Sequence, residues 1–142
     1  MASFNPASIG ESCTCLALRK AARDIARRYD EAFRPLDINN GQFAMLTAIA
    51  GLQPAGIQAL GRRLGMDRTT VTAALKPLER RGLVQIDVSE GDLRGRAVTL
   101  TPQGQAILKD AVPLWKKVQA ETARQLGGEH EMNDFRKQLA LL

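Results

Sequence analysis

The segment from residue 56 to residue 101 restricts the fold more than any other part of the chain. Its hydrophobic pattern predicts two short helices joined by a turn at Gly65-Met66, with Gly82 ending the second helix. Two strands are predicted at residues 83–89 and 96–101, because apolar and polar side chains alternate in both. The segment therefore predicts a mainly α-helical fold with one small β-hairpin.

The second helix of this unit begins with a run of small polar side chains. Asp67 is placed to cap the helix, since its carboxylate can accept hydrogen bonds from free backbone N–H groups of the first turn. Val71, Leu75 and Leu78 form the apolar face. Short donors at a helix N-terminus can reach phosphates and base edges, so we predict that the polar residues contact duplex DNA. These residues are Arg68, Thr69, Thr70, Thr72 and Lys76.

The tip of the predicted hairpin carries two arginines, Arg94 and Arg96, with Asp92 nearby. Glycines at positions 91 and 95 flank Arg94 and allow its backbone to approach a partner closely. An arginine on such a tip can enter the groove next to one that is occupied by a helix. We therefore predict that Arg94 and Arg96 also contact DNA.

The charge of the chain agrees with a polyanionic partner. The 142 residues carry a net charge of +5, and the pI is about 9.7. Residues 57–96 contain eight basic and five acidic side chains, so three of the five net charges lie in this segment. A concentration of positive charge on one structural unit favours binding to nucleic acid.

Other classes of function find less support in the sequence. No cluster pairs a nucleophile with a base, and the only histidine, His130, lies near the C-terminus, so we do not expect an enzyme. With Cys13 and Cys15 as the only thiols, one chain cannot assemble an ordinary zinc site, and we expect neither metal nor cofactor. The remaining alternative is a helix–turn–helix module that binds another protein without sequence-specific DNA binding. The cations Arg68 and Lys76 favour DNA instead.

The sequence also bears on the location of the protein. No apolar run approaches the length of about 20 residues that crosses a membrane. The first residues lack the basic and apolar character of a signal peptide. We therefore predict a cytoplasmic protein without a membrane partner.

The segments on both sides of the central unit are predicted to be helices with apolar stripes. They offer more apolar surface than the central unit can cover, which predicts a homodimer. We thus expect one domain over residues 1–142, in which residues 11–34 and 102–142 form dimerisation helices around a lobe of residues 39–101. The stripes consist of Cys15, Leu18, Ala22, Ile25, Tyr29 and Ala32 near the N-terminus, and of Met132, Phe135, Leu139 and Leu142 near the C-terminus.

Taken together, these motifs resemble the MarR family of winged helix–turn–helix regulators over nearly the whole chain. The resemblance implies an obligate two-fold dimer that binds a pseudo-palindromic operator, with repression as the commoner mode of control. It also places Arg94 at the wing arginine that enters the minor groove, with Asp92 as the acid that holds it. The matching segments are residues 60–64 (LGRRL), 69–72 (TTVT), 78–84 (LERRGLV), 92–94 (DLR) and 98–104 (VTLTPQG).

The family contains regulators released by small phenolic or aromatic ligands and others released by thiol oxidation. The chain resembles the members that sense organic hydroperoxides in having Cys15 and Tyr29 on its first helix. Fourteen residues of helix span about 21 Å, so the two groups can meet only across a two-fold axis. There, Tyr29 of one protomer would donate a hydrogen bond to Cys15 of the other and favour the thiolate. Arg19 stands where those sensors carry a tyrosine, and both modes of release remain open.

Overall fold

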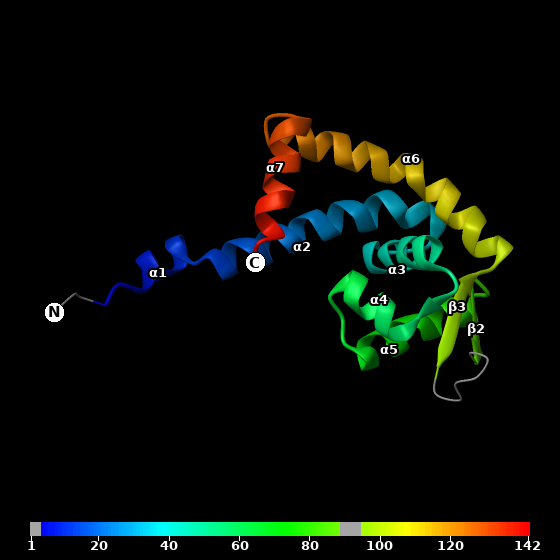
Figure 1. The fold of residues 1–142 in the computed structure, drawn as a ribbon. Helices are drawn as coiled ribbons and strands as arrows, with labels where there is room; N and C mark the ends of the chain where they lie inside the picture. Colours follow the sequence, from blue (N-terminus) through cyan, green and yellow to red (C-terminus); the bar gives the residue numbers. More distant parts are fainter. Residues whose placement is uncertain (1–3, 89–94) are drawn as a thin grey trace.

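The structure, a computed structural model, describes residues 4–88 and 95–142. Figure 1 shows the path of the chain, which is mainly helical with a small sheet, as the sequence predicted. The elements are α1 (Pro6–Ser12), α2 (Thr14–Phe33), η1 (Arg34–Leu36), α3 (Asn40–Leu52), β1 (Ala55–Gly56), α4 (Ile57–Leu64), α5 (Arg68–Arg80), β2 (Val84–Val88), β3 (Arg96–Leu100), α6 (Pro102–Gln125) and α7 (Glu129–Leu139).

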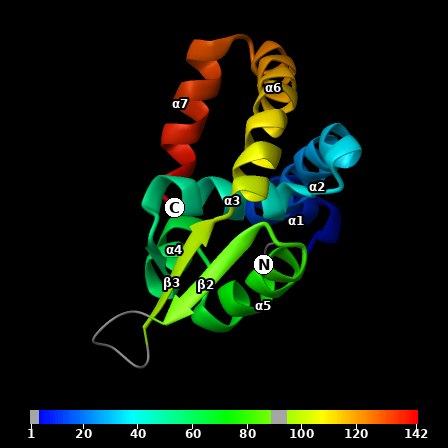
Figure 2. The same ribbon diagram turned by 90° about the vertical axis from the view of Figure 1, so that its right-hand side faces the viewer.

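The long helices α2 and α6 lie side by side, and α7 folds back from the end of α6 (Figure 1). Helix α1 extends away from the rest of the chain. Helices α3, α4 and α5 pack with the sheet into a second lobe (Figure 2). Buried Phe33, Ile38 and Ala111 join the two regions. Across the described ranges, no helix has both the length and the apolar character of a membrane span.

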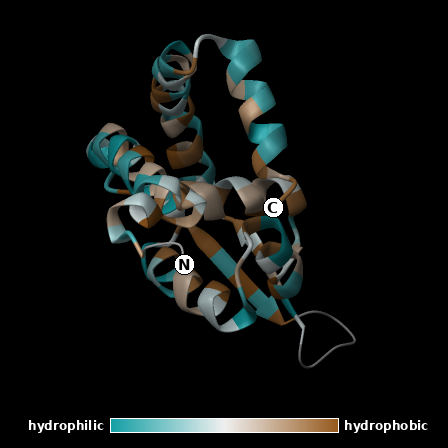
Figure 3. Cartoon of the chain, turned by 90° about the vertical axis from the view of Figure 1, so that its left-hand side faces the viewer, coloured by the Kyte–Doolittle hydropathy of each residue, from teal (hydrophilic) through white to brown (hydrophobic). Residues whose placement is uncertain are grey.

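The main core lies where α3, α4 and α5 meet the sheet. Hydrophobic and hydrophilic segments alternate along the strands and along α6 and α7 (Figure 3), as expected for elements with one buried face. The largest fully buried side chains of this core are Met45, Leu46, Ile49, Leu60, Val71, Leu75, Leu78 and Val98.

The sheet has three strands rather than the two of the predicted hairpin. Strands β2 and β3 pair antiparallel as expected, with Val84 opposite Leu100 and Val88 opposite Arg96. The additional strand β1 pairs with the other edge of β3, with Ala55 opposite Val98, so the order is β1-β3-β2. Two residues are too few to show a hydrophobic alternation, and the sequence pattern therefore missed β1.

The first predicted helix is divided in the structure. The sequence predicted one helix over residues 11–34, whereas α1 ends at Ser12 and α2 begins at Thr14. Between them, Cys13 has an extended backbone (ψ 107°), and its Sγ accepts from the N–H of Leu16 at 3.4 Å. The segment contains neither glycine nor proline at the break, so its sequence gave no sign of it.

The predicted ends of the central helices are confirmed. Gly65 and Gly82 adopt left-handed backbones, with φ of 67° and 71°. Asp67 caps α5, and Thr101 caps α6 by accepting from the N–H of Gly104 at 3.1 Å. Short side-chain acceptors and glycines therefore set these boundaries, as the sequence indicated.

The C-terminal end of α5 is tied to both long helices. Arg81 donates hydrogen bonds to the backbone carbonyls of Asp37 and Leu36 (3.4 Å for Leu36), next to the end of α2. On the other side, the N–H of Thr101, at the start of α6, donates to the carbonyl of Leu83 at 3.1 Å. These bonds fix the end of α5 relative to α2 and α6.

Gly104 lets the start of α6 lie directly on the chain that leaves α5. A Cβ atom at this position would lie 2.0 Å from the carbonyl oxygen of Leu83. No real side chain tolerates that distance, so the close contact requires glycine.

Candidate nucleic-acid interface

Helix α5 carries a hollow on its exposed face, opposite its buried face. We call this surface the α5 hollow; the structure places there four of the five residues that were predicted to contact DNA from this helix. Every residue that lines it is exposed. The lining residues are Arg68, Thr69, Thr72, Ala73 and Lys76.

Thr70, the fifth predicted residue of this helix, serves the helix cap. The Oδ1 atom of Asp67 accepts from the N–H of Thr70 at 2.7 Å, and the Thr70 side chain is also hydrogen-bonded to Asp67. The backbone hydrogen bond from Thr70 is the main reason why the pKa of Asp67 lies below its usual value. The cap fixes the direction in which α5 begins.

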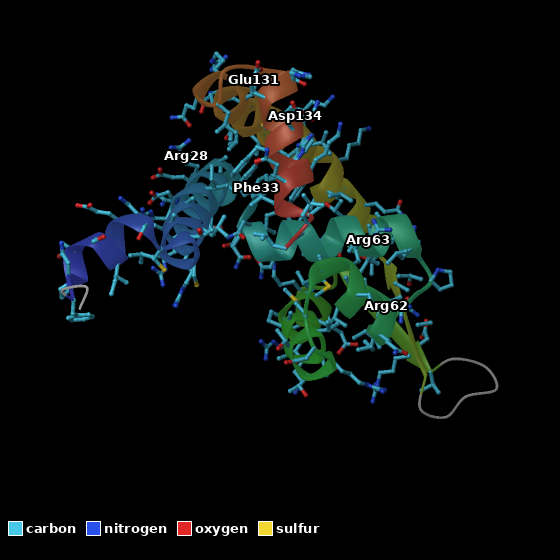
Figure 4. The ribbon with its side chains drawn as sticks, turned by 60° about the vertical axis from the view of Figure 1, so that its left-hand side comes forward. Arg28, Phe33, Arg62, Arg63, Glu131 and Asp134 are labelled. Carbon is cyan, nitrogen blue, oxygen red and sulfur yellow. The ribbon has the colours of Figure 1, made fainter. Side chains whose placement is uncertain are left out.

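A second hollow lies between α4 and the start of α5, and it adds a residue that the sequence did not single out. Arg62 and Gln58 line it together with Arg68. Figure 4 shows that Arg62 and its neighbour Arg63 occupy different sides of α4. In the sequence the two arginines contribute equally to the charge of the segment. The position of α4 in the fold places Arg62 in this hollow and Arg63 elsewhere.

The hairpin is described only in part. Asp92 and Arg94, which were predicted to act at its tip, lie outside the described residues, and their roles stay predictions. Arg96 begins β3, pairs with Val88 in the sheet and is exposed. The contact of Arg96 with DNA also stays a prediction.

A larger hollow of about 540 Å³, here called the interlobe hollow, lies between α2, α3, α4 and α6. Aromatic side chains from three helices line it, namely Tyr29, Phe33, Phe43 and Trp115. Arg63 and Asn40 contribute polar groups to an otherwise mainly apolar wall. The sequence did not indicate which residues line this hollow, since they come from four separate elements.

The pair proposed for thiol sensing lies on α2. Cys15 is exposed in the single chain. Tyr29 is partly buried, and its hydroxyl donates a hydrogen bond to Gln119 of α6 in the same chain. Burial raises the pKa of Tyr29, and the positive charge of Arg136 acts in the opposite direction. The predicted contact between Cys15 and Tyr29 of a second chain stays a prediction.

An apolar groove of about 380 Å³ runs between α2, α6 and α7. We call it the α7 groove; Leu18, Ile25, Leu126, Phe135 and Leu139 are among its apolar lining residues. Phe135 and Leu139 are 41% and 37% exposed in the single chain, which is unusual for large apolar side chains that line a groove.

The helix pair α4–α5 followed by the β2–β3 hairpin defines a winged helix protein. Residues 38–95 match the profile of the MarR family. The structure is similar to that of the transcriptional regulator MosR from M. tuberculosis in complex with DNA, with 36% identity and a TM-score of 0.81 over 90% of this chain and 93% of that chain. The chain belongs to the MarR family.

Two further comparisons agree with this assignment. A mutant MarR from E. coli complexed with operator DNA has 25% identity and a TM-score of 0.84, over 93% of this chain and 95% of that chain. The HTH-type transcriptional regulator SarZ of Staphylococcus haemolyticus is 31% identical over 90 residues, which is 63% of this chain and 61% of that relative. These relatives are transcriptional regulators rather than enzymes.

Proposed function

We propose that the protein is a dimeric transcriptional repressor that binds a pseudo-palindromic operator. The observation that carries the proposal is the α5 hollow, where two cations, Arg68 and Lys76, flank small polar side chains on a helix face with no core role. Cations of this kind contact phosphates, and short side chains let the helix enter the major groove. Arg94 and Arg96 would contact the neighbouring minor groove.

The dimer would be formed through the α7 groove and the exposed apolar residues near both chain ends. Two recognition helices related by a two-fold axis reach successive turns of one DNA face when they stand about 34 Å apart. A pseudo-palindromic operator matches this symmetry. The exposed Leu16 on α2 and Phe135 on α7 support the burial of these helices against a second copy.

A salt titration tests DNA binding and separates it from the protein-interaction alternative. We expect the affinity for a duplex selected from a random library to fall by at least about 10³-fold between 50 and 200 mM salt, if six or more phosphates are contacted. Arg94→Ala should weaken binding by about 1–3 kcal/mol. Fluorescence anisotropy measures both, and Arg124→Ala, an exposed arginine of α6, is the matched control. An affinity without salt dependence or sequence preference would favour the protein-interaction module.

We further propose that a small phenolic or aromatic ligand in the interlobe hollow releases the operator. The volume of about 540 Å³ lies within the range of about 300–1,000 Å³ that is typical of ligand sites. Phe33, Phe43 and Trp115 offer aromatic walls, and the Arg63 guanidinium offers a partner for a phenolate or carboxylate. Because the walls come from α2, α3, α4 and α6, an occupant would shift these helices relative to one another.

Thiol oxidation at Cys15 is the second candidate, supported by the exposure of this cysteine on α2. An organic hydroperoxide would convert the thiolate to a sulfenic acid and yield the alcohol. The added bulk and polarity at the dimer contact would displace the helices it joins.

One titration compares the two modes of release. Protein bound to labelled DNA is treated with stoichiometric cumene hydroperoxide or with a panel of phenols and aromatic carboxylates, and anisotropy is followed. Release by phenols together with a change in Trp115 fluorescence, and no difference between wild type and Cys15→Ser toward the peroxide, is the expected result. Peroxide release in the wild type that is absent in Cys15→Ser would assign the switch to the thiol instead.

A further inference from the structure

The three threonines of α5 use their hydroxyl groups in different ways. The Thr70 side chain is hydrogen-bonded to Asp67, at the helix cap. The hydroxyl of Thr72 donates to the backbone carbonyl of Arg68 at 2.9 Å. Within the part of the chain that the structure describes, the hydroxyl of Thr69 has no hydrogen-bond partner. Only Thr69 therefore offers an uncommitted hydroxyl to a partner.

The commitment of the Thr72 hydroxyl changes what this residue presents to solvent. A threonine that donates to the carbonyl four residues earlier turns its oxygen toward its own helix. The methyl group is then the part of the side chain that remains for outside contacts. Ala73, the next residue, also ends in a methyl group and lines the same α5 hollow. Two consecutive residues of this hollow, between Arg68 and Lys76, can thus offer a methyl group to a partner.

Methyl groups have one specific counterpart in the major groove of DNA. Thymine carries a C5-methyl group, whereas the other bases present only hydrogen-bonding groups and ring edges there. The flanking cations would draw this surface toward the phosphates of the duplex. We propose that Thr72 and Ala73 recognise the C5-methyl group of a thymine in each operator half-site, while Thr69 supplies the hydroxyl for a polar contact. The proposal rests on the DNA binding proposed above. It states which side chains determine the sequence specificity of that binding.

The test removes the methyl group from each side of the contact in turn. A duplex is first selected from a random library with the purified protein, and each thymine of a half-site is then replaced by deoxyuridine, which lacks only the C5-methyl group. For the wild type, we expect the substitution of one thymine to weaken binding about fourfold, the effect of about 0.8 kcal/mol for one buried methyl group. Anisotropy titrations supply the affinities.

Two variants of Thr72 assign the effect to its methyl group. Thr72→Val keeps a methyl group and removes the hydroxyl, so it should retain both the affinity and the sensitivity to deoxyuridine. Thr72→Ser keeps the hydroxyl and removes the methyl group, so deoxyuridine should weaken its binding clearly less than that of the wild type, because only the methyl group of Ala73 is left in the contact. At Thr69 the order is reversed: Thr69→Ser should bind like the wild type, and Thr69→Val should bind more weakly.

Circular dichroism melting curves test whether all four variants are folded. The proposal is overturned if no thymine in the selected half-site responds to deoxyuridine, or if Thr72→Ser keeps the full response. Failure of the proposed function gives a different result, because selection would then yield no preferred duplex at all.

Discussion

Replacing Gly104 with alanine should destabilise the protein by about 3 kcal/mol, the upper part of the range for overpacking a tight contact. The new Cβ atom would lie 2.0 Å from the carbonyl oxygen of Leu83, so α6 or the chain leaving α5 must move. That carbonyl also accepts from the N–H of Thr101, which means that a backbone hydrogen bond is lost with the movement. The neighbouring atoms belong to backbone and cannot avoid the clash by rotating a side chain.

Chemical denaturation of Gly104→Ala measures this loss of stability. Gly51→Ala is the matched control, since Gly51 also lies in a helix but has no atom within 4 Å of an added Cβ. Alanine there should leave the stability unchanged or raise it by about 0.5–1 kcal/mol. Equal melting curves for Gly104→Ala and the wild type would show that α6 does not rest on Leu83.

Phe135→Glu should produce a monomer and lower the affinity for the operator by about 100-fold or more, because joining two half-site contacts is worth 10²–10⁴ in binding. Phe135 lines the α7 groove and is 41% exposed in one chain. If a second copy covers the groove, a carboxylate at this position would be transferred from water into an apolar contact. The desolvation of an unpaired charge strongly opposes such a contact.

Sedimentation equilibrium and anisotropy measure the two parts of this prediction. Gln138→Glu introduces the same charge three residues later on α7, outside the lining of the α7 groove, and should remain a DNA-binding dimer. A folded Phe135→Glu dimer with normal DNA affinity would show that the dimer contact lies elsewhere. A monomer with normal affinity would remove the requirement for two-fold binding.

Local signals in the sequence were sufficient for the lobe that carries α5. The cap at Asp67, the turn at Gly65 and the start of α6 at Thr101 each depend on one or two neighbouring residues, and each was predicted. The outward face of α5 followed from its helical period, because Val71, Leu75 and Leu78 had to be buried. These features are local, so a pattern along the chain describes them well.

Features that depend on distant segments were missed. Strand β1 exists because Ala55 meets Val98 of β3, and a two-residue segment alone does not indicate that pairing. The walls of the interlobe hollow come from four elements. Two of its lining residues, Phe33 and Trp115, are far apart in the sequence. The break at Cys13 has no glycine or proline beside it. Within the candidate site, only the placement of α4 distinguished Arg62 from Arg63.

The attachment at the C-terminal end of α5 lets the whole lobe that packs around this helix act as a lever on the long helices. Arg81 and Leu83 join that end to the long helices, whereas the side chains proposed to contact DNA begin at the opposite end, at Arg68. The 13 residues of α5 give a lever arm of about 20 Å, so a rotation of about 5° moves the far end by about 1.7 Å. Hydrogen bonds to bases tolerate only a few tenths of an ångström. A slight change in the angle between α2 and α6 would therefore be enough to take α5 out of register with the bases that it is proposed to contact.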